Sequence, residues 1–531
     1  MQPRMCYDDA AWEKSEEISE AWIAQFDDLD ILRELGRFLV RHHEPDKPDS
    51  FDFLEKGAFN ISFEMTYKNT SSAIIRLPQP GAIMFPEEKV RNEVAIMRYI
   101  LDQTSIPAPF VLHWGTQKDS PLGLGPFMIM EFMDHHTNMY DVLNMPGRSR
   151  AYRGILDPDF DEDELERLYG ELAYILLQLS RPSLCHIGSL SQVDDFTWEV
   201  AHRPLSMPMN ELIRVGSLPQ ACLPSLDTTF DTASSYFESL AEIHIAHLTH
   251  QRNDAVHSAD DCRRKFVARC LFRKLARERK LTERWASFEN GPFKLWCDDF
   301  RPGNVLLNKD SKIAAVVDWE FTYAAPVEFS YAPPWWLLIE KPEYWPTDGG
   351  LEDWCGEYES RLQTFLRAMI TREDEAIRKC QLKENQRLSG PMRESWESGD
   401  FWVAYAARNN FAFDAIYWQK IDRRFFGPTT CPDPADAWKE RLEHLNAEEK
   451  CAMEKLVSQQ LENMKSRVLA WDPDEYTLSQ VDIAKKKAER EEGETKEAET
   501  GAKESEKVDV QVEVDEASAD MVSTEFARLA V

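Results

Sequence analysis

Three side chains in one short stretch of the chain have the types and the spacing needed to handle a phosphate group. Asp299 and Asn304 lie five residues apart in the loop WCDDFRPGNVLL, and Asp318 follows the apolar run IAAVV. A carboxylate can accept or orient the proton of an attacking hydroxyl, and carboxylate and amide oxygens are hard ligands that suit Mg²⁺. The pattern predicts phosphoryl transfer, with Asp299 as the base and Asn304 and Asp318 as metal ligands. The alternative is a β-hairpin whose acidic side chains face water.

The composition is that of a large globular chain with an acidic surface. Its 531 residues exceed the size of one ordinary domain, so two or three domains or lobes are expected. The formal net charge of −32 argues against nucleic acid as a partner, because phosphate backbones are bound by basic surfaces. The charge is mildly compatible with a cationic small substrate, although most acidic proteins are acidic for solubility alone.

Cysteine usage and hydropathy bear on the compartment. The ten cysteines form no C-x-x-C pair, which indicates neither a zinc site nor a disulfide framework. Free thiols in a large chain are typical of a reducing compartment. The first residues lack the apolar core of a signal peptide, and no stretch approaches about 20 uninterrupted apolar residues, so no membrane partner is expected. These observations predict a cytoplasmic protein.

The periodicity of apolar residues predicts a β-rich part near the N-terminus. Residues 10–42 carry apolar side chains at helical spacing, and residues 61–67 alternate between apolar and polar as a half-buried strand does. AIIRL, at 73–77, is a second strand that pairs with the first. A helix begins at Pro86 with two acidic residues in its first turn. PFMIMEFM, at 126–133, is a buried strand.

The rest of the chain is predicted to be mainly helical, apart from a strand–turn–strand unit. From about residue 485 the sequence has no Trp or Tyr and carries fourteen acidic and eight basic residues. Such a segment has too little apolar surface to offset the entropy lost on ordering. The predicted parts are a helical extension (1–50), a small β-rich lobe (51–133), a large mainly helical lobe (134–475) with a catalytic hairpin at 294–320, and a disordered charged tail (476–531).

This order of parts, with the motif residues, resembles the aminoglycoside phosphotransferase/choline kinase-like family. The family's loop reads roughly H-G-D-L-x-P-x-N and is followed by a strand that ends in D-W or D-F. Here the loop is CDDFRPGN, at 297–304, and the later motif is DWE, at 318–320. With DWEFTYAAP and YAPPWWLLIEKPEYW, the version found here looks like a fungal-type branch of the family. The resemblance spans about residues 50–470 and departs at Cys297, where the family usually has a His that orients the backbone and the base.

The resemblance implies an α+β, two-lobed, protein kinase-like fold that binds ATP, or GTP as an alternative, together with Mg²⁺. It implies a nucleotide-covering turn at Gly57 and Asn60, where a single Gly lets backbone N–H groups approach the phosphates. Arg76 stands where the family has a phosphate-gripping Lys, and Glu93 on the following helix is its natural partner.

The same resemblance places the adenine beside the strand PFMIMEF. The backbone groups of Glu131 to Met133 are the candidates for holding its edge. Trp335 and Trp336 are interpreted as core residues rather than as an aromatic platform for a cationic substrate.

The predicted function is an ATP- and Mg²⁺-dependent phosphotransferase that acts on a hydroxyl of a small molecule, which could be cationic. One alternative is a kinase-like binding or scaffold protein without turnover, which the replacements at Cys297 and Arg76 favour slightly. Another is a protein kinase, against which stands the lack of H-R-D, D-F-G and A-P-E motifs. No motif identifies the acceptor or the oligomeric state.

Overall fold

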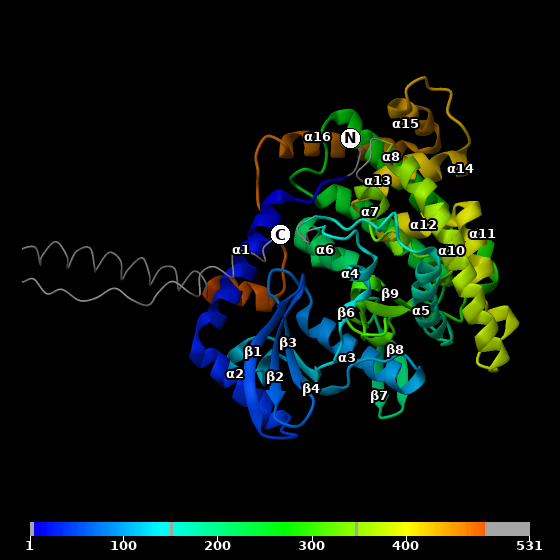
Figure 1. Cartoon of the computed structure of the whole chain (residues 1–531). Coiled ribbons are helices and arrows are strands. Elements are labelled where there is room, and N and C mark those ends of the chain that lie inside the picture. Colours follow the sequence, from blue (N-terminus) through cyan, green and yellow to red (C-terminus); the bar gives the residue numbers. More distant parts are fainter. Residues whose placement is uncertain (1–4, 149–151, 346–348, 484–531) are drawn as a thin grey trace, which may run out of the picture.

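The computed structural model describes residues 5–148, 152–345 and 349–483. These residues form a small lobe built around a sheet and a large lobe built mainly of helices, and Figure 1 shows the small lobe in blue at the lower left. This is the two-lobed α+β architecture predicted from the order of the elements.

The small lobe is built on a five-stranded antiparallel sheet with the strand order β1-β2-β3-β5-β4. The alternation predicted for the first strand is confirmed, because Ile61, Phe63 and Met65 are buried on one face. The sheet begins at Pro48, inside the range expected for the helical extension. The strands are β1 (Pro48–Lys56), β2 (Asn60–Tyr67), β3 (Ala73–Pro78), β4 (Val111–Gly115) and β5 (Phe127–Glu131).

Helices cover both faces of this sheet. The alternation along β3 sends Ile75 to a core shared with α1 (Asp9–Ile23) and α2 (Leu29–His42), and sends Ile74 to the core that contains α3 (Pro86–Gln103). Helix α3 begins with Pro and has two glutamates in its first turn, as predicted, where they meet the positive end of the helix dipole. The N-terminal helices thus complete the core of the small lobe.

The large lobe consists of helices packed around a continuous apolar core. Helix α5 pairs with α10, and α8 lies between α7 and α16 (Figure 1). The helices, in chain order, are α4 (Met139–Leu143), α5 (Glu162–Ser180), α6 (Met207–Val215), α7 (Ala233–His250), α8 (Ala259–Arg277), α9 (Val327–Ser330), α10 (Leu351–Arg378), α11 (Ser389–Ser398), α12 (Asp400–Arg408), α13 (Phe413–Ile416), α14 (Asp422–Phe426), α15 (Ala437–Arg441) and α16 (Ala447–Asn463).

The strands of the large lobe differ from the single hairpin expected at 294–320. β9 (Lys294–Cys297) pairs with β12 (Thr322–Ala325), and β10 (Val305–Leu307) pairs with both β11 (Ile313–Val316) and β6 (Thr137–Asn138). The chain therefore leaves β9 through one loop and returns to it through another, and the two loops lie side by side. A further hairpin, β7 (Ser189–Asp194) with β8 (Thr197–His202), was not expected.

The C-terminal boundary of the ordered part also differs from the prediction. We expected disorder from residue 476, but residues 475–483 are helical. Tyr476 and Thr477 are buried, the Tyr476 hydroxyl donates to the Leu124 carbonyl, and the Thr477 hydroxyl accepts from the Gly81 N–H at 3.3 Å. The apolar ring of Tyr476 holds this segment against the small lobe. Residues 484–531 lie outside the described residues.

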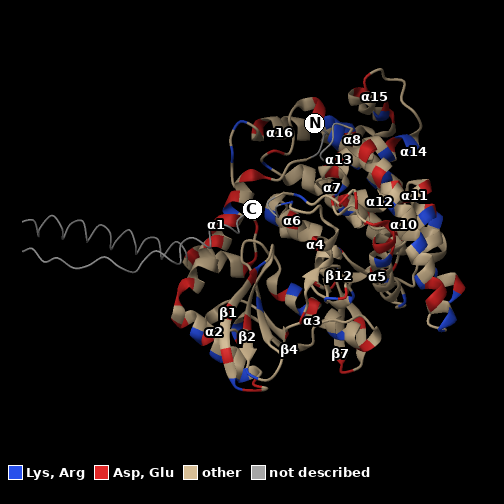
Figure 2. Cartoon of the chain, in the orientation of Figure 1, with Lys and Arg blue, Asp and Glu red and all other residues tan. Residues whose placement is uncertain are grey.

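Charge is distributed over both lobes. Figure 2 shows acidic and basic side chains scattered along the helices of the described part. Within that part, no helix combines the length and the apolar character that crossing a bilayer requires.

Candidate active site

A cleft of about 1370 Å³ lies between the lobes, and every residue predicted to act as base, metal ligand or nucleotide contact contributes to its wall. The β1–β2 turn, β3, α3 and the segment after β5 form one side. The β9–β10 loop and the segment after β11 form the other. The predicted residues that line it are Gly57, Asn60, Arg76, Glu93, Glu131, Met133, Asp299, Asn304 and Asp318.

The loop after β9 holds Asp299 in place through its own polar side chains. Asn304 donates its amide to the Asp299 carbonyl at 2.9 Å and to the carboxylate at 3.2 Å. Arg301 donates Nε to the other carboxylate oxygen at 3.1 Å. Burial raises the pKa of Asp299, Arg301 opposes this change, and the neighbouring carboxylates of Glu320 and Asp318 reinforce it. Asp299 is therefore oriented and more basic than an exposed carboxylate.

The turn after β11 places Asp318 beside this loop. The Val317 N–H donates to the Asn304 carbonyl at 2.9 Å, which ties the two segments together. Asp318 has a φ of +59°, a left-handed conformation that costs a non-glycine residue about 1 kcal/mol. Strain of this kind persists where the surroundings hold the backbone, and it is common at functional sites. The side chain is about one-third exposed and faces the cleft.

Opposite these loops, a network of charged side chains is almost fully buried in the small lobe. Arg76 spans two carboxylates, with Nη1 at 3.0 Å from Glu93 and Nη2 at 3.2 Å from Glu320, and Nη2 also lies 2.8 Å from Asp318. The planar fork of Arg holds the two carboxylates at fixed positions on separate nitrogens. Burial acts to lower the pKa of Arg76, but the three carboxylates outweigh it and the pKa is raised.

Two members of the network, Lys89 and Glu320, escaped the sequence analysis. Lys89 Nζ lies 3.3 Å from Glu93, donates to Asn60 Oδ1 at 2.8 Å, and forms a close ion pair with Glu320. Asn60 also donates to Glu320 at 3.0 Å. Burial alone would raise the pKa of Glu320, but Lys89 and Arg76 hold it below its usual value. Their positions offered a signal, since Lys89 lies one helical turn before Glu93 and Glu320 lies two residues after Asp318.

These contacts determine which groups of Asn60 and Gly57 remain available to a ligand in the turn between β1 and β2. The Asn60 side chain is occupied within the buried network, so it braces the turn from below. The Gly57 N–H donates to the Asn60 carbonyl at 2.9 Å, and Gln79 donates to the carbonyls of both residues at 2.8 and 2.9 Å. Ser19 of α1 in turn donates to Gln79 at 2.8 Å. The N-terminal helix therefore supports the turn.

Of Glu131, Phe132 and Met133, the residues proposed for the adenine edge, two have their backbone N–H groups occupied. The N–H groups of Glu131 and Phe132 donate to the carbonyls of Phe110 and Ser72, each at 3.0 Å. We find no partner within the described chain for the N–H of Met133, which lines the cleft. Of the residues proposed for the adenine edge, Met133 has the available N–H. Apolar side chains that line the same cleft are Ile74, Met130, Leu306 and Val317.

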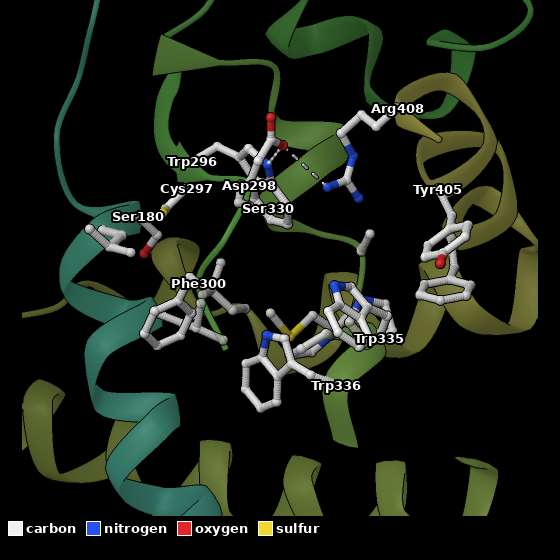
Figure 3. A pocket seen from close by; sticks show the side chains of 18 of the residues that line it. Ser180, Trp296, Cys297, Asp298, Phe300, Ser330, Trp335, Trp336, Tyr405 and Arg408 are labelled. Atoms are coloured by element: carbon white, nitrogen blue, oxygen red, sulfur yellow. Dashed lines mark hydrogen bonds and ion pairs between the residues drawn. The ribbon is translucent and has the colours of Figure 1, made fainter. Parts of the chain in front are cut away.

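Cys297, the main departure from the family motif, lies beneath the Asp318 turn. Its Sγ is 3.7 Å from the Glu320 carbonyl, to which the thiol can donate, and burial raises its pKa strongly. The thiol therefore stays protonated and contacts the backbone of the turn, which is the contact expected of an orienting residue. The next residue, Asp298, accepts from Trp296 Nε1 at 2.7 Å (Figure 3) and from the Met207 N–H at 3.2 Å, so it shapes the loop.

Comparisons with known proteins found distant likenesses among solved structures. No family model matches the chain, and no curated protein matches it. A thermostable mutant of the aminoglycoside phosphotransferase APH(4)-Ia, in a ternary complex with AMP-PNP and hygromycin B, is 14% identical and aligns with 74% of this chain and 100% of its own at a TM-score of 0.37. An ethanolamine kinase from Plasmodium vivax is 13% identical, with 77% and 85% covered and a TM-score of 0.35.

A third solved structure has a similar score. A putative fructosamine-3-kinase from Thermobifida fusca is 12% identical, with 77% of this chain and 98% of its own covered and a TM-score of 0.36. Likenesses of this size do not by themselves establish a function. Nor do they bear on the fungal-type branch, which stays a prediction.

Proposed function

We propose that this protein transfers the γ-phosphoryl group of ATP to a hydroxyl of a small molecule, with Mg²⁺ as cofactor and GTP as an alternative donor. The observation that carries the proposal is the convergence of Asp299, Asn304 and Asp318 on one wall of a cleft between two lobes. A scaffold without turnover would need none of the three in this arrangement, so the geometry favours an enzyme over the binding-protein alternative.

The oxygen donors present suit a magnesium ion shared with a nucleotide. Asn304 uses its amide nitrogen to hold Asp299, which leaves its oxygen as a ligand. Asp318 engages one carboxylate oxygen with Arg76 and is partly exposed. Among the described residues, no group of three or more His, Cys, Asp or Glu side chains could form a metal cage by itself. Two protein oxygens, with the rest from phosphates and water, is the usual arrangement for Mg²⁺ at phosphotransfer sites.

The protein's own residues then have distinct tasks. Met133 offers its N–H to the adenine edge, and the apolar side chains around it enclose the base. Asp299 accepts the proton of the acceptor hydroxyl, aided by a pKa that burial raises. Arg76 holds Asp318 in position from the small lobe. A bound Mg²⁺ would neutralise charge on the phosphate oxygens.

The test is nucleotide-dependent stabilisation with and without Asp318. ATP with Mg²⁺ should raise the melting temperature of the wild-type protein, and Asp318→Ala should lose that rise. Asp310→Ala, which removes an exposed carboxylate from the β10–β11 turn, is the matched control and should retain it. The proposal fails if ATP with Mg²⁺ leaves the melting temperature of the wild-type protein unchanged.

A further inference from the structure

Two cationic side chains, Lys341 and Arg408, line the end of the cleft nearest the large-lobe helices, although the chain as a whole has a net charge of −32. This end adjoins the catalytic loop, because the Asp298 carboxylate accepts from the N–H of Met207 at 3.2 Å. Asp299, the next residue, lines the same cleft. The residues that form this end of the wall are Met207, Pro208, Trp335, Lys341, Arg408 and Asn409.

Arg408 is the most deeply buried of these cations. It is the last residue of α12, its side chain is only 10% exposed, and its guanidinium lies over the rings of Trp296 and Phe329 at 4.2 and 4.7 Å. Figure 3 shows the guanidinium projecting into a small cavity beside Asp298. Only its Nε donates to a backbone carbonyl, that of Ala404 at 3.0 Å.

The nearest carboxylate does not use the remaining donors of Arg408. Nη1 is 3.9 Å from Asp298, beyond hydrogen-bond distance, and Asp298 is already held by the indole of Trp296 at 2.7 Å and by Met207. In the described part of the chain, no acceptor is hydrogen-bonded to either Nη group of Arg408. The Nη groups of Arg408 are not among the buried polar atoms without a partner, so they can be reached from the cleft and are available to a ligand there.

Lys341 is a second cation at the same end. It is half-buried and its Nζ lies 5.5 Å from the ring centroid of Trp335. No carboxylate of a described residue is within 4 Å of that ammonium group. Glu211 and Glu343 line a side cavity of about 60 Å³ next to both cations, but the Glu343 carboxylate already accepts from the Tyr405 hydroxyl at 2.6 Å.

The size of the cavities indicates where the acceptor would lie. The cavity beneath Arg408 has about 30 Å³ and the side cavity about 60 Å³, whereas ligand pockets usually have about 300–1,000 Å³. The acceptor therefore lies in the main cleft, against the half-buried face of Trp335. Trp335 thus lines the cleft, whereas Trp336 is a core residue as interpreted from the sequence.

We propose that the acceptor is a hydroxyl compound that carries an oxyanion group, a carboxylate or a phosphate ester, which Arg408 and Lys341 bind while Trp335 contacts its apolar part. The inference rests on the proposed function and names the acceptor class for the same site. A polycationic acceptor would meet these two like charges at short range. An anionic one would be drawn in by them and would be partly screened from the triphosphate.

The experiment compares four probes that share a benzyl alcohol group and differ in charge. They are 4-(hydroxymethyl)benzoate, 4-(hydroxymethyl)phenyl phosphate, methyl 4-(hydroxymethyl)benzoate and 4-(aminomethyl)benzyl alcohol. Binding to the full chain is measured by calorimetry with and without ATP and Mg²⁺. We expect at least one anionic probe to bind about tenfold tighter than the ester, with the amine weakest. The two anions separate a carboxylate site from a phosphate site.

Variants of Lys341 and Arg408 test whether these two cations cause the preference for an anionic probe. Lys341→Met should reduce the preference for the anion over the ester to about twofold or less, and Arg408→Gln should do the same. Among the described residues Lys341 has no ion pair to lose, so its variant should fold even if the Arg408 variant does not, and circular dichroism checks the fold of both. Lys379→Met, which removes an exposed lysine at the end of α10, is the matched control and should keep the full preference.

Several results would overturn the inference. They are equal binding of ester and anions, no binding of any anionic probe at millimolar concentration, or an unchanged preference in Lys341→Met. Weaker ATP binding in Lys341→Met, without a change in anion binding, would assign the cations to the nucleotide instead. Failure of the proposed function is distinct, since it appears as no stabilisation of the wild-type protein by ATP with Mg²⁺.

Discussion

The two ends of the cleft differ in how their charged side chains are paired. At the nucleotide end, Arg76 and Lys89 are matched by Glu93 and Glu320 within 3.3 Å. At the proposed acceptor end, Arg408 forms only a long ion pair with Asp298, at 3.9 Å, and Lys341 has no carboxylate of a described residue within 4 Å. Matched charges hold the lobes and the metal ligands in a fixed geometry before any ligand arrives. Cations that are held only loosely or by no carboxylate of the described residues keep donors available for a ligand.

The largest expected effect concerns the residue that lies between the two ends. Asp299→Asn should lower turnover by about 10²–10⁴-fold, because the amide cannot accept the hydroxyl proton. The affinity for ATP with Mg²⁺ should stay within about threefold, since the proposed metal ligands remain. Steady-state kinetics and calorimetry measure the two quantities. Asp310→Asn, at an exposed turn, should keep full turnover. Wild-type turnover by the Asp299→Asn variant would show that Asp299 is not the base.

The matched end is tested by removing one of its cations. Lys89→Met leaves Glu320, which is only 3% exposed, with one fewer partner and should destabilise the fold by about 3–5 kcal/mol. Urea unfolding followed by tryptophan fluorescence measures the free energy of unfolding. Glu320→Gln in the Lys89→Met background should recover part of the loss, because the unpaired charge is gone. Strictly additive effects in this cycle would show that the two residues do not interact.

These differences also explain which parts of the fold and the site could be predicted from the sequence. The proximity of Asp299, Asn304 and Asp318 could be predicted because a short loop and the strand that follows it fix their spacing, and their roles stay a prediction. The two-lobed order of strands and helices followed from periodicity for the same reason. Lys89 and Glu320 stood next to residues already singled out and could have been found from their offsets.

The acceptor end could not be found in this way. Arg408 lies on α12 and contacts the ring of Trp296 on β9, which is more than a hundred residues earlier in the chain. The sequence of α12 has the apolar pattern of an ordinary buried helix, so it does not single out Arg408. Lys341 appears in the sequence as one charge among many. Their significance depends on which carboxylates are absent from their surroundings, and that is a property of the folded packing. The docking of Tyr476 on the small lobe was missed for the same reason.

Glu328 is a buried carboxylate that, unlike Glu320, has no ion pair with a cation among the described residues. Neither oxygen of Glu328 has a hydrogen-bond partner among the described residues, and burial, with Glu289 and Asp400 nearby, raises its pKa to about 8. The folded protein then keeps a proton that the unfolded chain releases above its ordinary pKa of about 4.3. This contribution to stability is complete below that pH and is lost as the pH rises through about 8.

Glu328→Gln should therefore flatten the pH dependence of stability. Between pH 5 and pH 8 the free energy of unfolding of the wild-type protein should fall by up to about 1.4 kcal/mol per pH unit more than that of the variant. Urea unfolding at three pH values measures the slopes. Glu352→Gln, at an exposed position of α10, should leave the wild-type slope in place. Equal slopes for the Glu328 variant and the wild-type protein would refute the assignment.

The smallest effect on nucleotide affinity is expected at Gly57, the glycine of the predicted nucleotide-covering turn. Gly57 is absent from the residues with positive φ, and a Cβ there would meet only the Asn60 carbonyl, at an ordinary 3.5 Å. Gly57→Ala should therefore change the affinity for ATP with Mg²⁺ by less than about twofold, as measured by calorimetry. Gln79→Leu keeps the bulk but removes two hydrogen bonds to the turn, each worth about 1 kcal/mol, and should weaken affinity more. The reverse order would mean that the glycine itself, rather than the support from α1 through Gln79, sets the shape of the turn.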